Sequence, residues 1–265
     1  MWGRKRRIKQ NPKQKQNNAD SNSRPHSSKS SGLSMVTMDS PSAQRNKDPI
    51  YSVIESSVLP SLTQPSDGKS QPSLNALEIA AGCGVHTTHF VSKLAEKTNL
   101  NVQWIPTDPD PPSLQSLRAR VSEFVSPDSA RIQMHEPISL SLVEGGISEE
   151  EARSKLSQMP FLNFIICINM IHISPWTATL GLFKVGGEIL CAGGILVTYG
   201  PYKQNGTAVE SNLNFDQNLK RRNPEWGVRD LEKVVKVAEN NGFSLKKTIE
   251  MPANNLALVF VKNSL

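Results

Sequence analysis

Apolar runs of strand length alternate with apolar stripes of helical period along most of the chain. The compact runs are expected to be strands and lie, in order, at 74–80, 101–108, 130–136, 162–170, 193–200, 243–251 and 256–262. Between most of them, apolar residues recur every three or four positions. Such alternation with short connections predicts a parallel sheet, wound right-handed, with helices on both faces.

The expected helices are 49–58, 86–98, 111–125, 148–159, 177–190 and 227–242. Asp48 and Pro49 are expected to begin the first helix, because aspartate is a good N-cap and proline is tolerated at the first helical position. The last two strands are joined only by the turn PANN, so they predict an antiparallel pair at the sheet edge. The predicted fold class is therefore α/β, a Rossmann-like, mostly parallel doubly wound sheet with an antiparallel C-terminal strand.

Residues 1–43 are mainly Lys, Arg, Gln, Asn, Ser and Pro, with few apolar residues to bury. Ordering such a segment costs entropy with no compensating burial, so we expect a disordered basic tail followed by one domain at 44–265. The run Arg4-Lys5-Arg6-Arg7 suits a nuclear address, a loose nucleic-acid contact or simply a solvated tail.

The formal net charge of +6 comes from this tail. Residues 1–47 hold 11 Lys and Arg against two acids, so the rest of the chain has three more acids than bases. A nucleic-acid partner is therefore expected only through the tail, and a small molecule is preferred for the domain. Three widely spaced cysteines, no secretory apolar region and no run of about 20 apolar residues predict a soluble intracellular protein without membrane contact. The expected location is the cytoplasm, or the nucleus if the tail acts as an address.

The stretch LEIAAGCGVHTTHF at 77–90 carries the first chemical signal. Gly82 and Gly84 follow a buried strand that holds Glu78, and a glycine turn there lets backbone amides approach a ligand closely. A dinucleotide motif would place a third glycine where Thr87 stands, which disfavours nicotinamide or flavin. The pattern instead matches E-x-G-x-G-x-G of S-adenosylmethionine enzymes, with Ala80 at the usual first glycine. A tight turn without a ligand is the alternative.

Polar residues follow the later strands at the same edge of the sheet, where doubly wound folds bind ligands. Asp108 ends the second strand and is expected to accept hydrogen bonds from ribose hydroxyls, and Glu136 after the third is expected to meet an adenine amino group or to be a surface acid. Asn169 ends the fourth strand, where an uncharged amide suits a sulfonium. His172 and Tyr199 are candidate proton acceptors, and a loop-structuring role for His172 is the alternative.

His86 and His89 are candidate zinc ligands by residue type. They are three residues apart on one predicted helix, and no cysteine pair or carboxylate ligand stands close in sequence. No metal is therefore expected, and both histidines are assigned to the helix that covers the cofactor pocket.

Together, several long motifs resemble the methyltransferase-like protein 26 family over about residues 44–262. They are LEIAAGCGVHTTHF, TDPD, CINMIHISPW, TYGPY, SNLNFDQNLKRRNPEWGVRDLE and MPANNLALVF, with RNKDPI before them. The resemblance implies a class I methyltransferase fold and S-adenosylmethionine as cofactor, but no particular acceptor. Residues after Ser211 set this pattern apart from other methyltransferases, so acceptor recognition is expected at Asn212, Asp216, Arg222, Asn223, Trp226 and Arg229.

The sequence therefore predicts an S-adenosylmethionine-dependent methyltransferase that acts on an unknown acceptor by in-line transfer. Two other functions stay open at this point. One is a scaffold that keeps the fold and the cofactor without transferring methyl groups, and acts through a loop at 201–229. The other is an RNA-modifying protein that holds its substrate through the tail.

Overall fold

The structure, a computed structural model, describes residues 37–62, 71–126, 128–159 and 161–264. Most of the predicted tail, residues 1–36, and the basic run within it lie outside the described residues. Within the described part, no helix combines the length and the apolar character needed to cross a bilayer.

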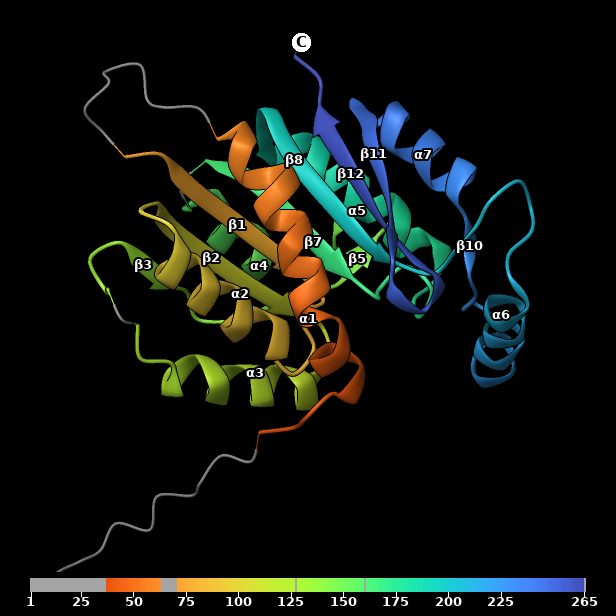
Figure 1. Cartoon of the computed structure of the whole chain (residues 1–265), viewed down its shortest axis with the longest axis horizontal. Coiled ribbons are helices and arrows are strands. Elements are labelled where there is room, and N and C mark those ends of the chain that lie inside the picture. The colour runs from red at the N-terminus through yellow and green to blue at the C-terminus, as the bar shows by residue number, and fades with distance from the viewer. Residues whose placement is uncertain (1–36, 63–70, 127, 160, 265) are drawn as a thin grey trace, which may run out of the picture. The chain divides into compact units, whose positions relative to one another are not determined.

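One mixed sheet forms the centre of the fold, and the predicted α/β class is confirmed (Figure 1). Its strand order is β11-β12-β8-β7-β1-β2-β3, with the short β4 also paired to β2. All neighbours from β3 to β8 are parallel, and β12 is antiparallel to both β8 and β11. The bounds are β1 Ser73–Ile79, β2 Asn101–Asp108, β3 Ile132–Met134, β4 Ile138–Ser139, β7 Leu162–Ile168, β8 Leu190–Gly200, β11 Phe243–Met251 and β12 Asn255–Lys262.

The predicted antiparallel pair lies at one edge of the sheet, as expected, and within it β11 is the outermost strand while β12 lies between β8 and β11. The side chains explain this order. Leu258, Val259 and Phe260 of β12 are buried, as a strand covered on both faces requires. On β11, Lys246 and Lys247 are exposed, and lysines of this kind protect an edge strand from further pairing.

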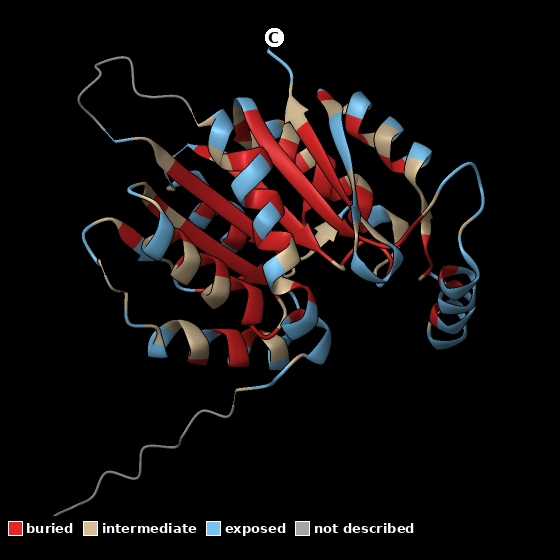
Figure 2. Cartoon of the chain, in the orientation of Figure 1, coloured by how far each residue is buried: buried red, intermediate tan, exposed pale blue. Residues whose placement is uncertain are grey.

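Helices cover both faces of the sheet. In Figure 1, α1 (Pro41–Val53) and α2 (Val85–Lys97) lie in front of it, and α4 (Glu150–Ser157) and α5 (Trp176–Ile189) lie behind. Helix α3 (Pro111–Glu123) runs beside α2, and α7 (Leu231–Asn240) packs on the α5 side. Two apolar clusters fill the two faces, so the central strands of the sheet are almost wholly buried (Figure 2). Strand order reverses between β1 and β7, and a ligand site is expected at their carboxyl ends.

Helix α1 begins eight residues earlier than predicted, at Pro41. Ser40 is its N-cap, with its side chain accepting a hydrogen bond from the amide of Ala43 at 3.3 Å. Ser40-Pro41 satisfies the same capping rule as Asp48-Pro49, and Pro49 lies inside the helix. The helix continues into a π-helical turn, η1 (Ile54–Val58).

The segment expected to be a loop at 201–229 contains a helix, α6 (Glu210–Arg222). It is flanked by a short parallel pair, β9 (Tyr202–Lys203) and β10 (Arg229–Asp230). Glu210 in its first turn and three basic residues in its last turn complement the helix dipole. The other short elements are the hairpin β5 (Leu142–Val143) and β6 (Gly146–Ile147), and the turns η2 (Leu59–Ser61) and η3 (Pro252–Asn254).

Candidate functional site

A first cavity of about 530 Å³ lies at the carboxyl ends of β1, β2 and β7. The turn between β1 and α2, the end of β2, the loop after β7 and the first turn of α1 surround it. Its walls include Ala80, Gly82, Asp108, Asp110, Asn169 and Trp226. Four predicted site residues, Gly82, Asp108, Asn169 and Trp226, are thus brought to one cavity.

The two glycines of the motif have different roles. Both have positive φ, +61° at Gly82 and +87° at Gly84. A Cβ on Gly82 would meet no atom within 4 Å, and Gly82 lines the first cavity, whereas a Cβ on Gly84 would lie 2.7 Å from Cδ1 of Leu117 on α3. Gly84 is therefore required by packing between α2 and α3, and only Gly82 leaves open space at the cavity wall.

The sequence led us to expect that the backbone amides of this turn would be free to bind a ligand, but the two glycine amides donate hydrogen bonds within the protein. The N–H of Gly82 donates to Oδ2 of Asp108 at 2.8 Å, and the N–H of Gly84 donates to the carbonyl of Ala81 at 3.2 Å. The other carboxylate oxygen of Asp108 accepts from the amide of Asp110 at 2.9 Å. Burial raises the pKa of Asp108. Each oxygen keeps a further lone pair for a ligand hydroxyl, so Asp108 both braces the turn and faces the cavity.

Glu78 does not line the first cavity. Its buried Oε2 accepts hydrogen bonds from Oγ1 of Thr87 at 2.7 Å and from Nε1 of Trp104 at 2.8 Å. Oε1 is buried and has no partner among the described residues. Burial raises the pKa of Glu78 to about 7. The structure therefore places this carboxyl as a tie between β1, α2 and β2, behind the cavity wall.

Glu136 lies away from both this cavity and the second one described below. Its side chain is 74% exposed and pairs with Arg118 of α3 at 3.3 Å. The surface alternative therefore describes its position, and the adenine contact gains no support from the geometry.

A second cavity of about 820 Å³ adjoins the first. It is enclosed by α1, the loop after β7, the end of β8, α6 and η3. Ser42, Asn169 and Ile173 line both cavities. Asn169 adopts φ +58°, and its amide donates to the carbonyl of Tyr199 at 2.8 Å. Asparagine adopts this left-handed conformation more readily than most residues with a side chain, and the turn it makes here holds Asn169 at the wall that the two cavities share.

His172 and Tyr199 both line the second cavity and are buried. Burial, helped by the charge of Arg229, lowers the pKa of His172 to about 4, so its imidazole is neutral at pH 7. Burial raises the pKa of Tyr199, although hydrogen bonds with Asn46 and Asn255 oppose the shift. The imidazole is unprotonated and has an acceptor nitrogen, but its low pKa makes it a weak base, while the phenol stays protonated and can donate a hydrogen bond.

Three of the residues predicted after Ser211 lie at or beside the cavities. Asn212 of α6 lines the second cavity and donates from Nδ2 to the carbonyl of Asn254 at 2.8 Å. Trp226 lines the first cavity, and the guanidinium of Arg222 lies 5.3 Å from its ring centre. Arg222 itself lines neither cavity and acts on Trp226 from outside.

The other three line neither cavity and hold the backbone around the site. Asp216 accepts from Lys203 and Lys220, each at 2.8 Å, and from the amide of Val228 at 2.8 Å. Oδ1 of Asn223 accepts from the amide of Glu225 at 2.9 Å. Arg229 donates to the carbonyls of Ile171, Ser174 and Glu225. Arg229 thereby clamps the loop that carries His172.

Sequence reasoning missed the contribution of α1. Ser42, Arg45 and Asn46 project from it into the second cavity, and Oδ1 of Asn46 lies 2.7 Å from Nε2 of His86. The motif RNKDPI contains two of these residues and was the available signal. Among the described residues, no group of three or more His, Cys, Asp or Glu side chains is placed to hold a metal ion.

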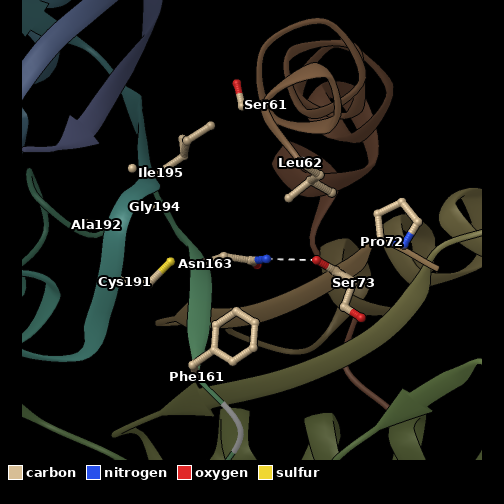
Figure 3. Close-up of a pocket in the computed structure, with 11 residues that line it drawn as sticks. Ser61, Leu62, Pro72, Ser73, Phe161, Asn163, Cys191, Ala192, Gly194 and Ile195 are labelled. Carbon is tan, nitrogen blue, oxygen red and sulfur yellow. Dashed lines mark hydrogen bonds between the residues drawn. The ribbon is translucent and has the colours of Figure 1, made fainter. Parts of the chain in front are cut away.

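A further cavity of about 350 Å³ lies at the opposite end of the sheet, where β1, β7 and β8 begin (Figure 3). Asn163 bridges two strands there, donating from Nδ2 to the carbonyl of Ser73 at 2.7 Å and accepting from the amide of Asn75 at 2.9 Å. Its amide is thus occupied by the sheet. The amino ends of parallel strands are also not where doubly wound folds bind ligands.

Comparison with protein families gives a match over residues 37–262 to the family described as "Protein of unknown function (DUF938)". The chain belongs to this family. The match includes residues 37–43, which were predicted to be the end of the tail, and α1 begins within them at Pro41. The resemblance to the methyltransferase-like protein 26 family stays a prediction.

Solved methyltransferases have a similar fold. An O-methyltransferase family protein from Burkholderia thailandensis matches with a TM-score of 0.58 at 11% identity, over 84% of this chain and 57% of that one. Human N-acetylserotonin methyltransferase in complex with SAM matches with 0.56 at 10%, over 84% and 53%. An O-methyltransferase family 2 protein from Planctomyces limnophilus in complex with apigenin matches with 0.57 at 16%, over 85% and 62%. The chain spans little more than half the length of these proteins, and the likeness confirms the methyltransferase fold.

Proposed function

We propose that this member of the DUF938 family is an S-adenosylmethionine-dependent methyltransferase acting on a small-molecule acceptor. The observation that carries the proposal is the pair of adjoining cavities at the carboxyl ends of the strands, with Asn169 and Ile173 in their shared wall. Methyl transfer needs two ligands held end to end, and two cavities with a common wall suit this arrangement.

The residues of the first cavity fit the cofactor. Gly82 leaves open space where any side chain would project, and Asp108 and Asp110 offer carboxylate oxygens to hydroxyl or amino groups. When bound, S-adenosylmethionine supplies a methyl carbon activated by its sulfonium and leaves as a neutral thioether. Asn169 and the first turn of α1 would then separate this ligand from water and orient it toward the second cavity.

The second cavity would hold the acceptor, with His172 as the residue that takes its proton. As the acceptor oxygen or nitrogen forms its new bond to carbon, it becomes strongly acidic and loses its proton. The unprotonated imidazole of His172 would receive this proton and, because a pKa of about 4 makes it a weak base, would then release it to solvent. Tyr199, which stays protonated, would orient the acceptor by a hydrogen bond. The complexes of similar proteins with SAM and with apigenin support a cofactor and a small acceptor of this general kind.

Calorimetric titration with S-adenosylhomocysteine tests the cofactor site. Asp108→Ala removes a charge-assisted acceptor and should weaken binding by about 10-fold or more, and Gly82→Arg should abolish it by filling the cavity. Lys246→Ala, on the exposed edge strand, is the control and should bind normally. Unchanged affinity in both site variants would remove the cofactor from this cavity.

Incubation with methyl-labelled S-adenosylmethionine and fractionated extracts tests the reaction. We expect label in a small-molecule fraction and a large loss of turnover in His172→Ala. Label only in protein or RNA would reject the small-molecule acceptor. Cofactor binding without transfer in any fraction would reject the enzyme and favour the scaffold. Full turnover in His172→Ala would leave this residue a purely structural part of the loop.

A further inference from the structure

The two cavities differ in charge. The first has the carboxylates of Asp108 and Asp110 in its walls and no lysine or arginine, whereas the second has no carboxylate and one fixed charge, the guanidinium of Arg45. From this contrast, and resting on the proposed function, we infer that the methyl acceptor is a small hydroxylated carboxylate whose anionic group binds Arg45.

Arg45 is available for a ligand because the acids near it in sequence are otherwise engaged. Asp48 pairs with His89 at 3.0 Å, and Asp39 accepts from Nε2 of Gln44 at 3.0 Å. Arg45 forms no ion pair with any carboxylate in the described part of the chain. The planar guanidinium presents parallel N–H donors that match the two oxygens of a carboxylate.

Its position in α1 directs Arg45 to the acceptor. Ser42, Arg45 and Asn46 are three and four residues apart, so they share one face of the helix, and all three line the second cavity. Arg45 is exposed at the edge of this face, while Asn46 is buried. An anionic group bound at Arg45 would therefore lie toward the mouth, with the rest of the molecule extending inward to His172.

The remaining walls fit the uncharged part of such a molecule. Asn212 and Asn255 offer amide donors and acceptors for hydroxyl groups, and Phe215 and Pro252 offer apolar surface for a ring or short chain. A protonated amine would find no carboxylate in these walls and would face the positive charge of Arg45. A phosphate monoester carries a charge of about −1.5 to −2 at neutral pH, more than one guanidinium balances, so a carboxylate is the better match.

Three catechols of similar size and different charge test the inference. They are 3,4-dihydroxybenzoate, 3,4-dihydroxybenzamide and 3,4-dihydroxybenzylamine, with charges of about −1, 0 and +1 at neutral pH. Each is titrated calorimetrically into the full-length protein saturated with S-adenosylhomocysteine. We expect the benzoate to bind roughly 5- to 10-fold more tightly than the amide, because Arg45 is partly solvated, and the amine to bind most weakly.

Variants at Arg45 then assign the preference to this side chain. Arg45→Ala should equalise the benzoate and the amide, and Arg45→Glu should make the amine the tightest of the three. Arg221→Ala, an exposed arginine on α6 outside both cavities, should keep the wild-type order. Equal binding of the three probes, binding of none, or a benzoate preference that survives Arg45→Ala would overturn the inference. Failure of S-adenosylhomocysteine to bind would instead contradict the proposed function, so the two failures are distinguishable.

Discussion

Alanine substitutions at Gly82 and Gly84 should separate ligand binding from packing within one motif. Both residues have positive φ, so either alanine costs roughly 1–2 kcal/mol of backbone strain. At Gly82 the new methyl group meets nothing within 4 Å and projects into the first cavity. Gly82→Ala should therefore lose about 0.5–1 kcal/mol of stability, because the lower entropy of the unfolded alanine offsets part of the strain, and it should bind S-adenosylhomocysteine more weakly.

Gly84→Ala should be the more destabilising change. Its methyl group would lie 2.7 Å from Cδ1 of Leu117 and 3.2 Å from Cδ of Arg120. Leu117 is fully buried, so it cannot move into solvent, and overpacking of this kind costs roughly 1–3 kcal/mol. Added to a net strain of about 0.5–1 kcal/mol, the expected loss is about 1.5–4 kcal/mol, with cofactor affinity retained wherever the protein is folded.

Urea unfolding monitored by circular dichroism gives the stabilities, and calorimetry gives the affinities. Leu117→Val removes the clashing Cδ1, so the double variant with Gly84→Ala should be less destabilised than the sum of the two single variants by about 1 kcal/mol. The reasoning fails if Gly82→Ala is as destabilised as Gly84→Ala, or if the double variant shows no coupling. It also fails if Gly84→Ala stays stable but loses the ligand.

Two further predictions concern strain and acid. Ala80 has φ +54°, a conformation that is strained for alanine. Ala80→Gly should therefore raise the free energy of unfolding, measured by urea titration, by about 0.5–1 kcal/mol after the entropy of the unfolded glycine is subtracted. A lower free energy of unfolding would show that the contacts of the alanine methyl group outweigh the strain. Stability should fall between about pH 6.5 and pH 4, because burial lowers the pKa of His86 and of His172 to about 4 and only the unfolded chain takes up those protons in this range. Each histidine contributes about 3 kcal/mol to this loss of stability. Glu78 acts in the opposite direction, because burial raises its pKa to about 7 and the folded protein therefore binds this proton at a higher pH than the unfolded chain does. Its contribution cancels that of about one histidine. Urea unfolding across this pH range should give a net loss of about 3 kcal/mol, a steeper one in Glu78→Gln, and a flat profile would contradict the assignment.

The sequence predicted the strands and most helices because each is a local pattern. Strand order depends on long-range pairing, yet a signal for it was present. The run LALVFVK is apolar on both faces and indicates an interior strand, whereas the lysines in FSLKKTIEM indicate an edge. Helix α6 escaped detection because polar residues dominate it: of its buried residues Asn212, Asp216 and Leu219, only Leu219 is apolar.

The site was predictable as far as topology determines it. Gly82, Asp108 and Asn169 lie at the carboxyl ends of β1, β2 and β7, with His172 in the same loop as Asn169, and the carboxyl ends of parallel strands converge whatever the side chains are. The topology of the sheet does not determine the position of α1, because this helix precedes the first strand and its place over the two cavities depends on how it folds back.

The same limit applies to the use of each motif residue. A motif predicts the shape of the backbone, but partners brought from elsewhere decide whether a side chain faces a ligand or the protein. Glu136 has its partner in Arg118 of α3, and Asp216 has two lysines, so acids expected to bind ligands are neutralised within the fold. Arg45 is the reverse case, because an ordinary surface arginine becomes a candidate ligand contact through the absence of acids in the cavity walls around it. In this fold, an unpaired side chain in a cavity wall is therefore better evidence for the chemistry of the ligand than the presence of a residue in the motif.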